Sequence, residues 1–339
     1  MTSAGRQRVL RLVPWALVAG LVVVVVLARP ASVASALAAA WRVPWVVGLV
    51  LPVFLLWNHA GVLGWRTLWT AVHGASKPSL LRLTAARMGA AAVNMVLPTG
   101  GVGGEVIRVA AGGASRETLA GSAVVVVLDD AASTLAVLLL VAVSAAVLAF
   151  VSADGPAWAA VAFALPLLVG ILLWGAPAVL ARVARWKWIE RRVPRLTDVL
   201  RDAGRRMAVI GRAFRRSTGW HVVERVLTCV EIWVAAVALG LAFGPLDALV
   251  TGGLMTGASL LFFFVPGQLG AAEGAVAGAF AVLGFPPETG LAVALLRRGR
   301  QVVTSVLGLV LLAAVQRWRN GRSPAGCESV GRAAASQGD

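Results

Sequence analysis

Two glutamates occupy matching positions in two separate apolar stretches of the chain. Glu105 lies seven positions after Pro98, and Glu273 lies seven positions after Pro266, with glycines between each pair. A bilayer tolerates interrupted helices and ionisable side chains only where protein or a water-filled cavity surrounds them. Paired interruptions, one in each half of a chain, indicate a binding site at the interface of an internal repeat. The predicted chemistry is therefore recognition of a polar group within a membrane.

Further charged residues interrupt apolar sequence near these glutamates. Asp129 and Asp130 follow an apolar run; adjacent residues on a helix point about 100° apart, so one of the two is expected to face inward. Arg108 lies three positions after Glu105 and is expected to pair with it on one helix face. The candidate partners for the two aspartates are Arg87, Arg108, Arg297, Arg298 and Arg300.

The basic cluster at 297–300 suits a phosphate, because arginine presents a fixed fork of donors. It could instead neutralise Glu273 and Asp129, or only set topology. Each glutamate could likewise only stabilise the restart of a helix, and the aspartates could lie near an interface. The predicted substrate-binding residues are Asn94, Glu105, Arg108, Asp129, Glu273, Arg297 and Arg300. The predicted break residues are Pro98, Gly101, Gly104, Pro266 and Gly270.

No catalytic or metal-binding pattern accompanies these residues. The sequence contains no HExxH, Walker A or GxSxG motif, and its three histidines are too scattered to suggest a metal site. Two cysteines give neither a disulfide framework nor a metal cluster. We therefore expect a protein that is not an enzyme and that needs no cofactor.

The elements that must position the charged residues are transmembrane helices. The chain has 339 residues, of which 59% are hydrophobic and 14% charged, and its mean hydropathy is +0.84. A span needs roughly 20 apolar residues. The expected spans are 13–29, 43–63, 119–150, 157–180, 221–243, 246–265 and 288–315. Two broken or re-entrant elements are expected at 85–112 and 266–285. The predicted fold is an all-α polytopic membrane protein with about 7–8 spans and an internal repeat.

The net charge of +16 comes from arginines in the predicted loops, so we expect no nucleic-acid partner. Because positive loops stay in the cytoplasm, we expect both termini to be cytoplasmic, and the high usage of alanine, arginine and glycine suggests a bacterial source. The first apolar run could also be a cleaved signal peptide, but a retained span is the favoured interpretation.

A basic segment divides the chain into two transmembrane halves, 1–180 and 221–316. Within 181–220, apolar residues recur every three or four positions from Val193 to Phe214, which predicts an amphipathic helix. Its arginines, in the segment 191–216, are expected to contact anionic headgroups. A passive anchor remains the alternative to lipid recruitment. The tail 317–339 is expected to be disordered.

These motifs resemble the transmembrane region of lysylphosphatidylglycerol synthases, a family also called flippase-like. The residues that carry the resemblance are Asn94–Pro98, Gly103–Arg108, Pro266, Glu273, Gly284 and Leu295–Arg297. Val102–Glu105, Asp129 and Leu296–Arg300 are similar to the hopanoid-biosynthesis-associated branch. The resemblance implies an integral inner-membrane protein that handles lipids. It also implies that synthesis belongs to a separate soluble domain, which this chain is expected to lack.

Three functions remain open from the sequence. The first is a lipid translocator or carrier, for hopanoid, aminoacylated or other phospholipids, in which Glu105, Glu273 and Arg297 bind or gate the headgroup. The second is a non-catalytic accessory subunit that recruits lipid-biosynthesis enzymes. The third is an intramembrane transferase, which the missing catalytic signature disfavours. The oligomeric state stays open.

Overall fold

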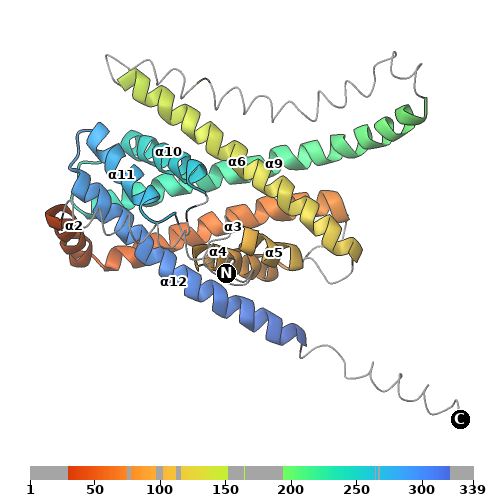
Figure 1. Cartoon of the computed structure of the whole chain (residues 1–339), viewed down its shortest axis with the longest axis horizontal. Coiled ribbons are helices and arrows are strands. Elements are labelled where there is room, and N and C mark those ends of the chain that lie inside the picture. Colours follow the sequence, from red (N-terminus) through yellow and green to blue (C-terminus); the bar gives the residue numbers. More distant parts are fainter. Residues whose placement is uncertain are drawn as a thin grey trace, which may run out of the picture.

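The computed structural model describes residues 30–74, 78–96, 102–111, 116–151, 164, 194–263, 265 and 268–320. This part of the chain contains helices and no strand, which confirms the predicted all-α fold (Figure 1). The helices are α2 (Pro30–Arg42), α3 (Trp45–His73), α4 (Leu80–Val96), α5 (Val102–Ala110), α6 (Arg116–Val151), α9 (Pro194–Ala238), α10 (Pro245–Leu261), α11 (Ala271–Val282) and α12 (Pro287–Asn320).

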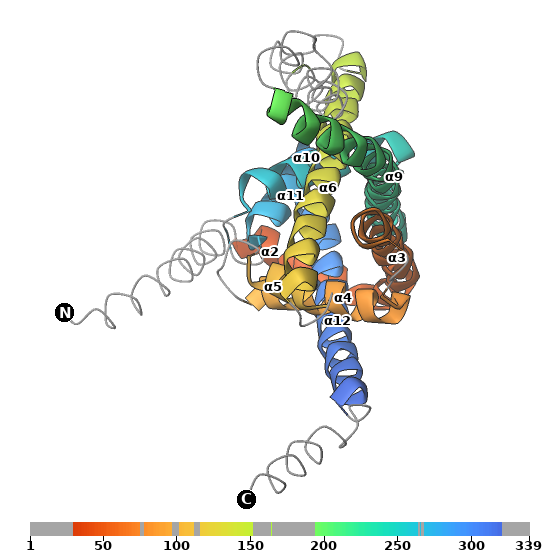
Figure 2. The same ribbon diagram turned by 90° about the vertical axis from the view of Figure 1, so that its right-hand side faces the viewer.

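The same succession of helices occurs twice. In the first half, the 17-residue α4 is followed by a break, the 9-residue α5 and the 36-residue α6. In the second half, the 17-residue α10 is followed by a break, the 12-residue α11 and the 34-residue α12. Helix α4 packs on α12, α10 packs on α6, and α3 packs on α9 (Figure 2). Helix α10 corresponds to α4, and α6 corresponds to α12, so the contact of α10 with α6 is the counterpart of the contact of α4 with α12. Matching contacts of this kind are expected when two related halves pack face to face.

Three of the helices are long and apolar enough to cross a bilayer by length and composition: Trp45–His73, Leu119–Ala149 and Pro287–Arg317. Helix α12 exposes a row of aliphatic side chains that includes Val302, Val306 and Val310. Such a surface suits contact with lipid acyl chains, which accept apolar side chains without cost. The described residues thus form a polytopic membrane protein.

Helix α9 runs without interruption from Pro194 to Ala238, across the boundary that the sequence placed at position 220. It has 45 residues, more than twice what one span needs. Its apolar stripe was expected to lie in the membrane interface. Instead Phe214, the last residue of that stripe, is only 7% exposed and packs among α3 side chains such as Trp65 and Leu68. At this position the stripe faces protein rather than lipid.

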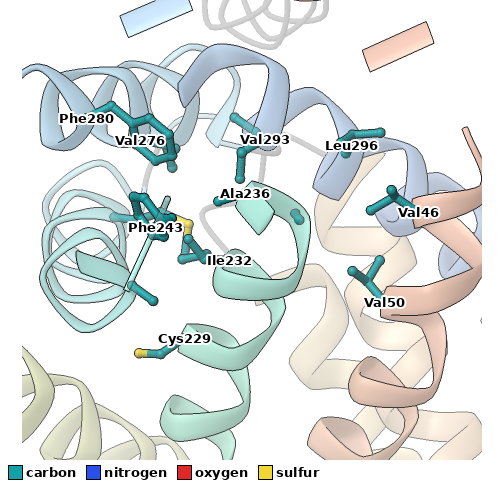
Figure 3. Packing of buried hydrophobic residues seen from close by; sticks show 14 of the residues in the cluster. Val46, Val50, Cys229, Ile232, Ala236, Phe243, Val276, Phe280, Val293 and Leu296 are labelled. Carbon is teal, nitrogen blue, oxygen red and sulfur yellow. The ribbon is translucent and has the colours of Figure 1, made fainter. Parts of the chain in front are cut away.

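The largest apolar core joins the second half to α3. Phe243 stacks on Phe280, with ring centroids 4.9 Å apart, and Ile232 and Val293 close the space between α9 and α12 (Figure 3). Val46 of α3 packs against the same cluster (Figure 3). This core holds α9, α11 and α12 in fixed register, which positions the charged residues on those helices.

Several predictions fall on residues outside the described part. These are the spans 13–29 and most of 157–180, the tail beyond residue 320, and the break residues Pro98, Gly101 and Pro266. Nothing further is concluded about them.

Candidate headgroup site between the two broken helices

An amide side chain bridges the first break, between α4 and α5. Asn94, near the end of α4, accepts a hydrogen bond through Oδ1 from the backbone N–H of Gly104, at 2.7 Å. This bond satisfies one of the free N–H groups in the first turn of α5. A Cβ at Gly104 would lie 2.5 Å from the carbonyl oxygen of Ala90. Glycine is therefore required for α5 to fold back so closely on α4.

The second break uses a glutamate for the same purpose. Gly270 precedes α11 with φ of +82°, a conformation that glycine adopts without steric cost. Its N–H donates to Oε2 of Glu273 in the first turn of the helix, at 2.9 Å. The other oxygen of Glu273 accepts from Arg298 at 2.7 Å. Glu273 thus has both of the roles that the sequence left open, a helix cap and an ion-pair partner.

Arg108 holds three carboxylates around the first break. Its guanidinium donates to Glu105 at 2.7 Å, to Asp129 at 2.5 Å and to Asp130 at 2.6 Å. It also lies over the ring of Trp65, 5.0 Å from the centroid. The predicted pairing of Arg108 with Glu105 and with the aspartates is therefore present. Asp129 faces inward and Asp130 is half exposed, as their angular separation on α6 requires.

Asp129 also connects α6 to α9. His221 lies 2.9 Å from Asp129 through Nε2 and contacts Glu224 through Nδ1. Glu224 in turn accepts from Arg87 of α4. We call the set of Arg87, Glu105, Arg108, Asp129, Asp130, His221 and Glu224 the Asp129 network. It ties α4, α5, α6 and α9 together through buried charges, which need such pairing to be tolerated away from water.

A second network lies nearer the second break. Glu231 of α9 accepts from Arg300 at 2.8 Å and lies 3.3 Å from Arg297. Arg300 also lies over the ring of Phe54, 4.4 Å from its centroid. Arg297 and Arg300 were candidate partners for the aspartates, but in the structure their acid partner is Glu231. We call Glu231, Arg297 and Arg300 the Glu231 network.

One cavity of about 520 Å³ lies between the two networks. It is reached by residues from both breaks, and all seven predicted substrate-binding residues line it: Asn94, Glu105, Arg108, Asp129, Glu273, Arg297 and Arg300. Six arginines and five carboxylates among the described residues line this central cavity. A cavity so rich in charge, inside a membrane protein, is suited to a polar ligand.

Arg225 is the cavity arginine with the fewest partners. Its nearest acid is Glu224 at 3.9 Å, its Nε is buried without a hydrogen-bond partner, and its guanidinium lies 5.9 Å from the centroid of the Trp57 ring. Among the described residues nothing accepts a hydrogen bond from it. Its donors are therefore free for an anion entering the cavity.

Sequence reasoning missed the contribution of α9. Five of its buried polar residues recur at spacings of four and three, which places them on one helix face: Ser217, His221, Glu224, Thr228 and Glu231. We call them the α9 polar stripe. The stripe supplies acids to both networks. The regular recurrence of polar residues beside apolar ones was the available signal, but the histidines were considered only as metal ligands, and no acid of α9 was among the predicted site residues.

No group of three or more histidine, cysteine or acidic side chains with a metal-binding arrangement occurs in the described part of the chain. The chemistry available in the cavity is thus charge pairing and hydrogen bonding by arginine, carboxylate and amide groups.

Comparison with known protein families gives a match over most of the chain. The family described as the lysylphosphatidylglycerol synthase TM region matches residues 13–308, which include both breaks and both networks. No curated protein and no solved structure was found to match the chain.

Proposed function

Because the chain belongs to the lysylphosphatidylglycerol synthase transmembrane-region family, we propose that it is a lipid translocator or carrier that takes the polar headgroup of a lipid into the central cavity. The observation that carries the proposal is the cavity itself. It is lined by eleven charged side chains, it lies among helices that are apolar outside, and both broken helices contribute to it.

The broken helices support a path for a ligand through the protein rather than a core that serves packing alone. Backbone without helical hydrogen bonds is tolerated at membrane depth only beside protein or water. In this chain both breaks adjoin one charged cavity, as expected for transporters built from repeats. The family's transmembrane region is its non-catalytic part, and we extend that to this chain, which we propose acts without catalysis and without a cofactor.

The free donors of Arg225 favour an anionic group in the ligand. A guanidinium binds a phosphate through two parallel charge-assisted hydrogen bonds. The carboxylates of Glu105 and Asp130, which also line the cavity, would receive positive or hydroxyl groups of the same headgroup. Candidate ligands are therefore phospholipids, aminoacylated phospholipids and hopanoids that carry polar extensions.

We also propose a location, which is a bacterial inner membrane with both termini in the cytoplasm. The family match supports a membrane protein, and the arginine distribution supports the orientation of the termini. Cysteine-accessibility labelling at positions 6 and 322 in intact cells and in inverted vesicles would test the orientation. Protection in cells and labelling in inverted vesicles is the expected result; labelling of either position in intact cells would contradict it.

The function is tested by mass spectrometry of lipids that co-purify with the protein in mild detergent. Wild type is compared with the Glu105→Gln/Glu273→Gln variant and with Arg225→Gln. Arg215→Gln serves as the matched control, since Arg215 lies on the exposed side of the same helix. Enrichment of one lipid class in wild type and control, and its loss in the cavity variants, is expected. A profile equal to the bulk membrane in all proteins would contradict the proposal and favour an accessory subunit that recruits lipid-biosynthesis enzymes.

A further inference from the structure

A second hollow, separate from the central cavity, lies between α3 and α9. It has a volume of about 540 Å³, and its basic lining residues are Arg66 on α3 and Arg212 and Arg216 on α9. No acidic side chain among the described residues lines it. We call this hollow the arginine groove.

The three arginines have no acidic partner in the described part of the chain. In the Asp129 and Glu231 networks, by contrast, every arginine is paired with a carboxylate. The Nε of Arg66 is buried without a hydrogen-bond partner. Arg212 and Arg216 are exposed to solvent, which weakens the repulsion among the three like charges, and an anion bound in the groove would offset it.

The groove's other polar side chains do not compete for that anion. The hydroxyls of Thr67 and Thr70 donate to the backbone carbonyls of Leu63 and Arg66, at 2.8 and 2.9 Å. Because these protons are used within α3, the donors available to a ligand are those of the arginines and of the indole of Trp220. Three guanidinium groups that line one groove favour a phosphate, which accepts several charge-assisted hydrogen bonds at once.

The remaining lining residues are apolar. Leu63, Val209 and Ala213 line the groove, and Val209 is an exposed hydrophobic side chain. A lining with arginines and tryptophan beside aliphatic groups matches a ligand with an anionic head and an apolar body. In a membrane protein, tryptophan is favoured where lipid headgroups meet acyl chains.

The α3–α9 seam separates this groove from the central cavity. Arg212, Arg216 and Trp220 face the groove, whereas Ser217 and His221 face Asp129 on the other side of α9. Gly64 allows α3 and α9 to pack closely at this seam, because a Cβ there would lie 3.1 Å from the Ser217 hydroxyl. A ligand in the groove therefore touches none of the cavity ion pairs.

We propose that the arginine groove is a binding site for the phosphate group of an anionic phospholipid, distinct from the site in the central cavity. The lipid's glycerol and upper acyl chains lie along the aliphatic part of the lining. The site does not depend on lipid movement through the cavity, so a result against the proposed function would not contradict this proposal.

The test is native mass spectrometry of the purified full chain titrated with phosphatidylglycerol and, separately, with phosphatidylcholine. The groove variant is Arg66→Gln/Arg212→Gln/Arg216→Gln, which keeps the side-chain stems. The matched control is Arg42→Gln/Arg215→Gln/Arg317→Gln, which removes three exposed arginines that line neither hollow. Thermal unfolding of both variants verifies that they fold.

Each arginine near an anionic lipid is expected to contribute about fivefold in affinity. The groove variant should therefore lose phosphatidylglycerol binding by roughly a hundredfold, while the control loses much less. Phosphatidylcholine binding should be weaker than phosphatidylglycerol binding in wild type and should change little in the groove variant. A photoreactive phosphatidylglycerol should crosslink to peptides that contain residues 209–220 in wild type and not in the groove variant.

Three outcomes would overturn the proposal. Equal losses in the groove and control variants would show a general charge effect. Unchanged binding and crosslinking in the groove variant would show that the lipid binds elsewhere. Glycerol phosphate that displaces phosphatidylglycerol at comparable concentration would show that the groove recognises a soluble phosphate compound rather than a lipid. Arg225→Gln, which alters the central cavity alone, should leave crosslinking to 209–220 intact.

Discussion

Asp129 and Asp130 offer a matched pair of substitutions. Both are aspartates on α6, and both accept a hydrogen bond from the guanidinium of Arg108, at 2.5 and 2.6 Å. They differ in burial, since the side chain of Asp129 is 1% exposed and that of Asp130 is 48% exposed. Replacing either by asparagine keeps the shape and removes one charge.

The expected costs follow from that difference. Removing one partner of a buried ion pair costs about 3–5 kcal/mol, and Asp129 is the most buried acid facing Arg108, as well as a partner of His221 and Arg87. Removing one partner of an exposed pair costs at most about 1 kcal/mol. With a shift of roughly 2 °C per kcal/mol for a chain of this size, Asp129→Asn should lower the Tm by roughly 6–10 °C. Asp130→Asn should lower it by less than about 2 °C.

The assay is thermal unfolding of both variants in the same detergent, followed by intrinsic tryptophan fluorescence. A double-mutant cycle with Arg108→Gln isolates the pairwise term. Coupling to Arg108 should be several-fold larger for Asp129 than for Asp130. Equal Tm shifts, or the larger shift for Asp130, would refute the assignment of Asp129 as the buried centre of its network.

Three further predictions concern the breaks and the second network. Gly104→Ala should cost about 1–3 kcal/mol in the free energy of unfolding, because its Cβ meets the Ala90 carbonyl; an unchanged midpoint in denaturant titration would argue against the close approach of α5 to α4. Gly274→Ala, in the first turns of α11 with open space around it, should be neutral or stabilising by up to about 1 kcal/mol, and a large loss by the same titration would contradict the helix assignment. Glu231→Gln should cost about 3 kcal/mol, because Arg297 and Arg300 then share no carboxylate; a thermal midpoint within 2 °C of wild type, by about the same scaling, would count against the Glu231 network.

Much of the charged site could be predicted from local patterns. Adjacent residues on a helix diverge by about 100°, which is why one of the two aspartates was expected to face inward. The spacing of Arg108 after Glu105 fixed that pair within a single helical turn. The breaks were visible because proline and glycine interrupt apolar runs, and both contribute residues to one cavity.

Contacts between distant segments were not predictable in the same way. His221 meets Asp129 across 92 positions of sequence, and no local spacing encodes that contact. Glu224 was also hidden by the assumed boundary at residue 220, because a charge at the end of a span is normally solvated. Only the continuity of α9 through that point places Glu224 and Arg225 inside the protein.

The amphipathic stripe shows a related limit. A row of apolar residues on a basic helix has the same pattern whether it faces lipid or protein. At one position the structure gives the answer: Phe214 faces protein, since it packs on α3. The orientation of an amphipathic face depends on what the rest of the chain offers, and that is a property of tertiary packing.

The central claim is that a lipid headgroup enters the central cavity and moves through it. The most direct measurement is the rate at which dithionite bleaches fluorescent headgroup-labelled lipids in proteoliposomes that contain wild type, Arg225→Gln or the control Arg215→Gln. Movement between leaflets predicts that wild type and control make about all of the labelled lipid accessible, whereas Arg225→Gln slows this at least about tenfold. Accessibility that stays at the protein-free level of about half in wild type, for every lipid class tried, would contradict the claim.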